Sequence, residues 1–164
     1  MNVFFKTTLG DFTLELDNEK CPTTVKNFLY YVENKFYIDT IFHRVIKGFM
    51  IQGGGFDENM IEKKTNEPIQ NEAKTGVSNL KYTISMARTS EPHSATSQFF
   101  INSVDNLFLN YTSESPQGYG YCAFGTVIND TSTIDKISNV ATQSMFPHDD
   151  VPVEPVIILD ANIL

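Results

Sequence analysis

Two polar side chains stand out in an apolar stretch at residues 40–55, which reads TIFHRVIKGFMIQGGG. Arg44 and Gln52 lie eight positions apart among phenylalanine, isoleucine, valine and methionine. A guanidinium buried in such a run is costly unless it is paired, and no acidic residue lies between positions 41 and 56. Arg44 is therefore either a hydrogen-bond donor that needs a partner from outside the chain, or a rim residue with its head in water.

The spacing predicts how these side chains meet. In a strand over residues 49–52, alternation places Met50 and Gln52 on one face. Arg44 precedes them across a short turn at residues 46–48, so a hairpin would bring Arg44, Met50 and Gln52 onto one surface. That surface would combine apolar area with the hydrogen-bonding groups of a guanidinium and an amide.

A second set of candidates lies in residues 85–110, which read SMARTSEPHSATSQFFINSVDNLFLN. Gln98 and Phe100 are two positions apart and face the same way in a strand, and Phe108 and Leu109 follow a polar turn. Taken singly, each phenylalanine fits an ordinary core position, and Gln98 fits a buried amide bonded to backbone. The residues alone leave core and site open as alternatives.

The sequence offers no machinery for covalent or metal chemistry. No GxxxxGK pattern accompanies the glycines at 53–55, so a phosphate cradle is not predicted. His43, His93 and His148 lie in separate regions without metal-ligand spacing, so we expect no metal. No serine lies in a nucleophile-elbow sequence. These observations favour binding, or a reaction that needs neither a nucleophile nor a cofactor.

Composition restricts the number of domains, the class of partner and the expected compartment. The chain has 164 residues, 41% of them hydrophobic, which fits one domain over residues 1–164. A net charge of −8 argues against nucleic-acid binding, which relies on a basic surface. Cys21 and Cys122 lack CxxC spacing, so we expect free thiols in a reducing compartment. With neither a signal-peptide pattern nor an apolar run of roughly 20 residues, we expect a cytoplasmic monomer without membrane contact.

Hydrophobic periodicity predicts a β-rich fold with two helices. Strands are expected at 3–7 and 12–16, because apolar and polar residues alternate there. After Pro22, apolar residues recur at helical spacing up to Val32, and a weaker pattern of this kind covers 131–140. Short apolar stretches between 41 and 124, and a closing strand over 153–159, complete the pattern of a barrel or sandwich.

Two motifs, in this order, resemble the cyclophilins, the cyclosporin-binding family of peptidyl-prolyl cis-trans isomerases (rotamases). The first runs from Phe36-Tyr37 through Phe42-His43-Arg44 to FMIQGG at 49–54, and the second joins SMA at 85–87 to SQFFI at 97–101. The resemblance covers essentially the whole chain and looks closest to the small bacterial cytoplasmic members. It implies a mainly β fold, a closed eight-stranded antiparallel β-barrel capped by two α-helices.

The resemblance also implies roles for individual residues. Arg44 matches the catalytic arginine, and Gln52 would position the Arg44 guanidinium by a hydrogen bond. The substrate proline and its neighbours would be bound by Phe49, Met50, Ala87, Arg88, Gln98, Phe100, Phe108, Leu109 and Tyr121. No metal and no cofactor take part in this chemistry. The expected partners are proline-containing peptides and unfolded proteins, whose folding the isomerase would assist.

Three features depart from the family pattern. Phe108 stands where many eukaryotic members have tryptophan, whose indole N–H bonds cyclosporin, so we expect reduced cyclosporin affinity with preserved proline turnover. Tyr121 takes the place of the family's site histidine. The connection from Arg88 to Gln98 is one residue longer than in the best-known eukaryotic members.

Two other functions are open at this point. A chaperone or scaffold would use the same pocket for capture rather than turnover, although the combination of Arg44, Gln52 and Phe100 favours catalysis. A barrel that binds a small ligand in its interior is the other alternative, but large apolar residues of the strands would fill that space.

Overall fold

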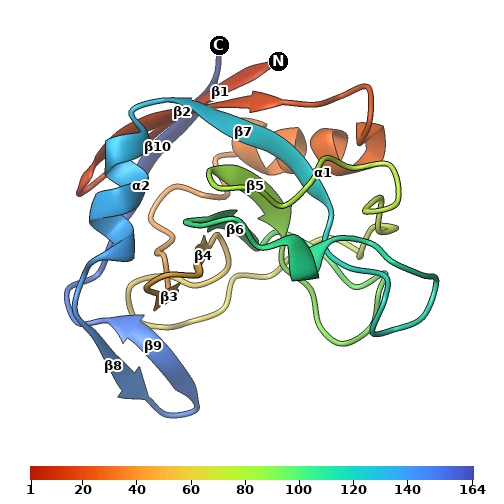
Figure 1. Ribbon diagram of the computed structural model, residues 1–164. Coiled ribbons are helices and arrows are strands. Elements are labelled where there is room, and N and C mark those ends of the chain that lie inside the picture. The colour runs from red at the N-terminus through yellow and green to blue at the C-terminus, as the bar shows by residue number, and fades with distance from the viewer.

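The alternating segments of the chain form one curved antiparallel sheet. The computed structural model describes residues 1–164, and the sheet has the strand order β10-β1-β2-β7-β5-β6-β4-β3 (Figure 1). Its strands are β1 (Asn2–Thr7), β2 (Gly10–Leu16), β3 (Arg44–Ile46), β4 (Met50–Gly53), β5 (Thr83–Met86), β6 (Phe99–Asn102), β7 (Ala123–Asn129) and β10 (Ile158–Ile163). The mainly β architecture of eight antiparallel strands and two helices that was expected from the sequence is confirmed.

The expectation of a closed barrel is corrected in one detail. The end strands of the sheet, β10 and β3, do not pair with each other. The segments that precede them meet instead, through an isolated bridge between Ile41 and Ile157 and a 3.0 Å hydrogen bond from the Phe42 N–H to the Val156 carbonyl. β3 has only 3 residues, and Pro155 has no N–H to donate, so a continuous ladder cannot form here.

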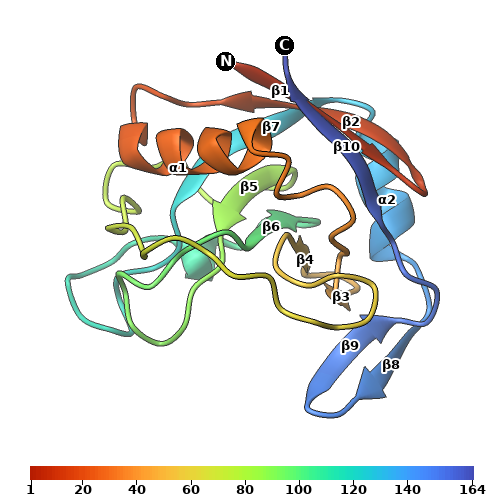
Figure 2. The ribbon, with the colours of Figure 1, turned by 180° about the vertical axis from the view of Figure 1, so that it is seen from behind.

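Two helices pack against the sheet at different sides (Figures 1 and 2). α1 (Pro22–Glu33) begins at the proline that suits a first helical turn, and it buries Val25, Phe28 and Val32 at the predicted spacing. α2 (Thr131–Ser138) buries Ile134 and Ile137. Neither helix has the length and apolar composition needed to cross a bilayer.

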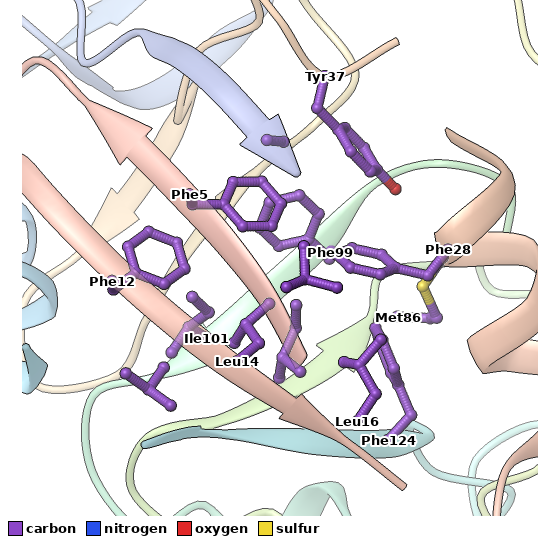
Figure 3. Packing of buried hydrophobic residues seen from close by; sticks show 14 of the residues in the cluster. Phe5, Phe12, Leu14, Leu16, Phe28, Tyr37, Met86, Phe99, Ile101 and Phe124 are labelled. Carbon is purple, nitrogen blue, oxygen red and sulfur yellow. The ribbon is translucent and has the colours of Figure 1, made fainter. Parts of the chain in front are cut away.

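Aromatic side chains fill the concave side of the sheet (Figure 3). The ring of Phe99 lies 5.7 Å from that of Phe28 and 6.0 Å from that of Phe5, both edge-on. All three are fully buried, and Tyr37 packs against each of them. The interior is thus occupied by the protein's own side chains, which argues against a small ligand inside the barrel.

The two cysteines meet in this core. Cys21, just before α1, and Cys122, just before β7, are both free and buried, and their sulfur atoms lie 3.5 Å apart in a shared hydrogen bond. That hydrogen bond, followed by burial, raises the pKa of Cys21 well above its usual range. The Cys21 thiol therefore stays protonated and packs as a small apolar group.

The end of the chain differs from the prediction. The segment 153–159, expected as a closing strand, is a strand only from Ile158 onward, and β10 continues to Ile163. A separate hairpin, β8 (Thr142–Met145) and β9 (His148–Pro152), precedes it and projects from the body of the molecule (Figures 1 and 2). Every residue of β8 is exposed, so this strand leaves no apolar alternation in the sequence to reveal it.

Candidate active site

The predicted hairpin of β3 and β4 brings the first candidates together. Arg44 pairs with Gln52 and Ile46 pairs with Met50 across the two strands. The Arg44 guanidinium donates from Nη1 to the Gln52 amide oxygen at 3.2 Å. Arg44 is exposed rather than buried, so its stem crosses an apolar surface while its head remains free to bond a ligand.

A second glutamine extends this series of hydrogen bonds. Gln52 donates from its amide nitrogen to the Gln98 side-chain oxygen at 2.9 Å, which leaves the Gln98 amide N–H groups as donors. Gln98 lies directly over Gly55, where an added Cβ would come within 2.5 Å of the Gln98 Cγ atom. The glycine at 55 therefore makes room for the glutamine.

The floor beside these hydrogen-bonded side chains is apolar. Met50, Phe100 and Leu109 form a small cluster separate from the main core, on the outer side of the sheet. Each of these side chains is at most 8% exposed. Met50 and Phe100 come from the neighbouring strands β4 and β6, and Leu109 from a short 3-10 turn at Leu107–Leu109. Successive side chains on β4 and β6 point to opposite faces of the sheet, so one set joins the main core and the other set joins this cluster.

Aromatic side chains form the walls. Phe49 and Phe108 stack with ring centroids 5.9 Å apart, and Phe108 remains 75% exposed at the rim. On the opposite wall, the Tyr121 ring meets Phe100 edge-on at 5.7 Å. The Arg88 guanidinium lies 4.5 Å from the centre of the Tyr121 ring, a cation–π contact that fixes both side chains.

These residues enclose a cavity of about 330 Å³. It is lined by Arg44, Phe49, Met50, Gln52, Ala87, Arg88, Phe100, Phe108, Leu109 and Tyr121. Gln98, the remaining residue of the predicted set, faces an adjoining polar hollow that shares Gln52, Ala87 and Arg88 with the cavity. The structure therefore brings all of the residues selected from the sequence into one place. Apolar walls with a few convergent polar groups are typical of a ligand site.

Buried amides beneath the cavity hold its walls, and the sequence reasoning missed them. Asn106 donates from Nδ2 to the Phe49 carbonyl at 2.9 Å and to the Asn102 side-chain oxygen at 2.8 Å. Asn79 donates to the Tyr121 carbonyl at 3.2 Å and accepts from Asn102 at 3.1 Å. All three asparagines are at most 3% exposed. The one available signal was the asparagine that ends the apolar run FFIN, since a buried amide needs partners.

One histidine lies next to the site but on the opposite face of the hairpin. His43 is 4% exposed, its Nδ1 has no hydrogen-bond partner, and its ring lies 4.6 Å from that of Phe56. Burial, with smaller contributions from His148 and Arg44, lowers the pKa of His43 to about 4. His43 is therefore neutral at physiological pH and adds no charge beside Arg44. No group of His, Cys, Asp and Glu side chains is placed to hold a metal ion.

Comparison with known proteins agrees with this geometry. The family model described as "Cyclophilin type peptidyl-prolyl cis-trans isomerase/CLD" matches residues 2–163. The chain belongs to the cyclophilin-type peptidyl-prolyl cis-trans isomerases. As a cyclophilin-type isomerase it is an enzyme, and the expectation drawn from the two sequence motifs is confirmed.

Two bacterial cyclophilin-type relatives match over nearly their full length. Peptidyl-prolyl cis-trans isomerase B of Escherichia coli is 56% identical over 161 residues, 98% of each chain. Peptidyl-prolyl cis-trans isomerase cyp18 of Streptomyces antibioticus is 54% identical, over 99% of this chain and 98% of its own length. The likeness to small bacterial members is thus also confirmed.

A solved cyclophilin structure supports the fold. The cyclophilin-type isomerase of Cryptosporidium parvum, crystallised in the presence of the dipeptide Ala-Pro, superimposes with a TM-score of 0.78 at 28% identity. The superposition covers 100% of this chain and 99% of the other.

Proposed function

We propose that this isomerase turns Xaa-Pro bonds by placing the Arg44 guanidinium against the prolyl nitrogen while the proline ring lies on the Met50, Phe100 and Leu109 floor. The observation that carries the proposal is the Arg44-to-Gln52 hydrogen bond at the edge of an apolar cavity. Gln52 fixes one N–H of the guanidinium, and the others stay free for the substrate.

The chemistry explains why an arginine is needed. Rotation about an Xaa-Pro bond has a barrier of roughly 18–20 kcal/mol, because the planar amide is stabilised by resonance. Halfway through rotation the prolyl nitrogen becomes pyramidal, and its lone pair can accept a hydrogen bond. The planar ground state offers little to accept with, so a donor fixed at this place stabilises the transition state selectively. Arginine suits the task because it stays protonated and presents a rigid fork of donors.

The apolar floor has a complementary role. It holds the proline ring while the preceding carbonyl swings, and it displaces water, which strengthens the hydrogen bond from Arg44. An acceleration on the order of 10⁵ needs about 7 kcal/mol off the barrier. We attribute this reduction jointly to ring anchoring, desolvation and the charged hydrogen bond, and no nucleophile or metal is required.

We place this activity in protein folding. Slow proline isomerisation limits the folding of many chains, and an open cavity that recognises mainly a proline ring suits unfolded or loop segments of varied sequence. In this proposal residues 1–164 act as one domain on unfolded proteins in the cytoplasm. The same cavity would take cyclosporin with reduced affinity, because Phe108 has no hydrogen-bond donor.

Capture of proline segments without turnover, as in a scaffold, is the second candidate, and one assay separates the two. Turnover of a short Ala-Pro-Phe peptide is measured by protease coupling for the wild type, Arg44→Lys and Arg44→Ala. We expect Arg44→Ala to lose about two orders of magnitude in kcat/KM and Arg44→Lys to retain part of the activity, with unchanged circular dichroism. Equal turnover in all three proteins would rule out the role of Arg44, whereas peptide binding without any turnover by the wild type would favour capture.

A further inference from the structure

The tip of the β8–β9 hairpin carries an aromatic side chain that nothing in the chain covers. Phe146 is 100% exposed, and Met145 beside it is 42% exposed. The tip lies at the far end of a hairpin that extends away from the sheet (Figures 1 and 2). An isolated exposed phenylalanine at a protruding end gains free energy from any apolar contact that removes it from water.

The tip also has the chemistry that the cavity recognises. Phe146 is followed by Pro147, which is exposed as well. Each of the other six prolines follows a buried or a polar residue; the preceding residues are Cys21, Glu67, Glu91, Ser115, Val151 and Glu154. Phe146–Pro147 is thus the one place where this chain presents an exposed apolar residue and a proline together.

Charge favours the same pairing. The cavity is lined by two arginines, Arg44 and Arg88, and by no carboxylate. The hairpin, residues 142–152, contains Asp149 and Asp150, which are separated from the tip by His148, and it has no lysine or arginine. When the tip enters such a cavity, its aspartates come close to the two guanidinium groups, and opposite charges at an interface steer and orient the encounter.

We propose that the Phe146–Pro147 tip of one copy docks into the proline cavity of a second copy and competes there with peptide substrate. Full exposure of Phe146 means that the tip does not fill the cavity of its own chain. The ring of Pro147 would lie on the apolar floor, and Phe146 against the exposed Phe108 at the rim. The proposal rests on the cavity being the proline-binding site proposed above.

The association is weak and transient. A single hairpin tip buries far less than the roughly 1,200 Å² of a stable interface. Each copy also carries a net charge of −8, so two copies repel each other at long range. The contact forms at high local concentration and leaves a dilute preparation monomeric.

Concentration-dependent NMR tests this contact on the full chain. Amide spectra are recorded from about 0.1 to about 5 mM, a range that brackets a Kd on the order of 1 mM. We expect progressive shifts both at residues 145–149 and around Arg44 and Phe108, reversed by an excess of Ala-Pro-Phe peptide. Pro147→Ala and Phe146→Ser should each abolish the shifts, whereas Pro155→Ala, at another exposed proline, should leave them unchanged.

The outcomes are decisive in both directions. Spectra that do not change with concentration, shifts at only one of the two places, or shifts that persist in both tip variants would overturn the proposal. Turnover measured at low enzyme concentration reports separately on the cavity: the wild type and Pro147→Ala should turn over peptide equally. Peptide turnover without self-association refutes the docking alone, whereas loss of turnover in the dilute wild type refutes the proposed function.

Discussion

At the edge of the cavity, the Arg44 guanidinium is held by one hydrogen bond to Gln52, and its other N–H groups face outward. The residue type of Arg44, its apolar neighbours and the missing acidic partner identified it as a candidate, and the spacing predicted that it shares a surface with Gln52, which the strand pairing bears out. Whether its head is buried could not be predicted, because exposure depends on what covers the hairpin from outside. The structure leaves the head of Arg44 exposed at the cavity edge, so the rim position and the binding role are compatible.

Phe108 gives a prediction at this scale. Phe108→Trp adds an indole N–H at the cavity rim, and a net hydrogen bond of about 1 kcal/mol corresponds to roughly fivefold tighter cyclosporin binding. Peptide turnover should change little, because the aromatic wall is preserved. Titration calorimetry measures the affinity.

A neighbouring substitution serves as the control for Phe108→Trp. Leu107→Trp adds the same indole on the same 3-10 turn, but Leu107 does not line the cavity. Equal cyclosporin affinity in Phe108→Trp and the wild type would contradict the explanation based on the missing donor.

Three paired strands and one turn position the residues of the site. The strands are β3, β4 and β6, and the turn is the 3-10 turn that follows β6. Alternation in the sequence predicted that Met50 and Gln52 share a face, and that Gln98 and Phe100 share another. The pairing of β4 with β6, which places Gln52 opposite Phe100, comes from the structure. The turn at Leu107–Leu109 depends instead on Asn106, which donates to the distant Phe49 carbonyl and to the Asn102 side chain. Hydrogen bonds of this kind produce no periodic pattern in the sequence, so they could not be predicted from it.

Substitution of Asn106 tests whether its hydrogen bonds support the cavity wall. Asn106→Ala leaves the Asn102 side-chain oxygen without its donor and removes one of the two donors to the Phe49 carbonyl, which keeps the Ser103 N–H. We expect the free energy of unfolding to fall by about 1–3 kcal/mol. The KM for peptide should rise, because the Phe49 backbone at the cavity wall loses one of its two hydrogen bonds. Urea unfolding and steady-state kinetics measure the two effects.

An exposed asparagine serves as the control for Asn106→Ala. Asn18 lies on the surface away from the cavity, so Asn18→Ala should leave both the unfolding free energy and KM unchanged. A fall in stability without any rise in KM would show that the amide network supports the fold but not the site.

For the whole molecule, one sheet separates two apolar clusters. Its concave side holds the aromatic core, and its outer side holds the cavity floor. The strand order and the gap between β3 and β10 come from long-range pairing, which local patterns do not encode. The exposed β8–β9 hairpin escaped prediction because nothing buries its first strand.

Burial of His43 predicts a pH dependence of folding. In the native state the pKa of His43 is lowered from its usual 6.5 to about 4, so between these values only the unfolded chain binds the proton. Stability therefore falls as the pH drops from 6.5 to 4, by about 3 kcal/mol for a shift of this size, and His43 has no effect above this range.

Urea unfolding at several pH values tests this dependence. The variant His43→Phe keeps the ring packed against Phe56 and removes the titrating group, so it should lose less stability than the wild type between pH 6.5 and 4. Parallel curves for the two proteins in that range would contradict the assignment to His43.

In the proposed mechanism, Arg44 acts on the rotating bond rather than on the bound peptide. NMR exchange spectroscopy on an isotope-labelled Ala-Pro-Phe peptide at saturating enzyme measures both the dissociation constant and the cis-trans rate on the protein. For Arg44→Ala we predict a rate at least about 100-fold slower with a dissociation constant changed by less than about threefold. An unchanged rate with weakened binding would show that Arg44 binds the peptide and does not act on the rotating bond.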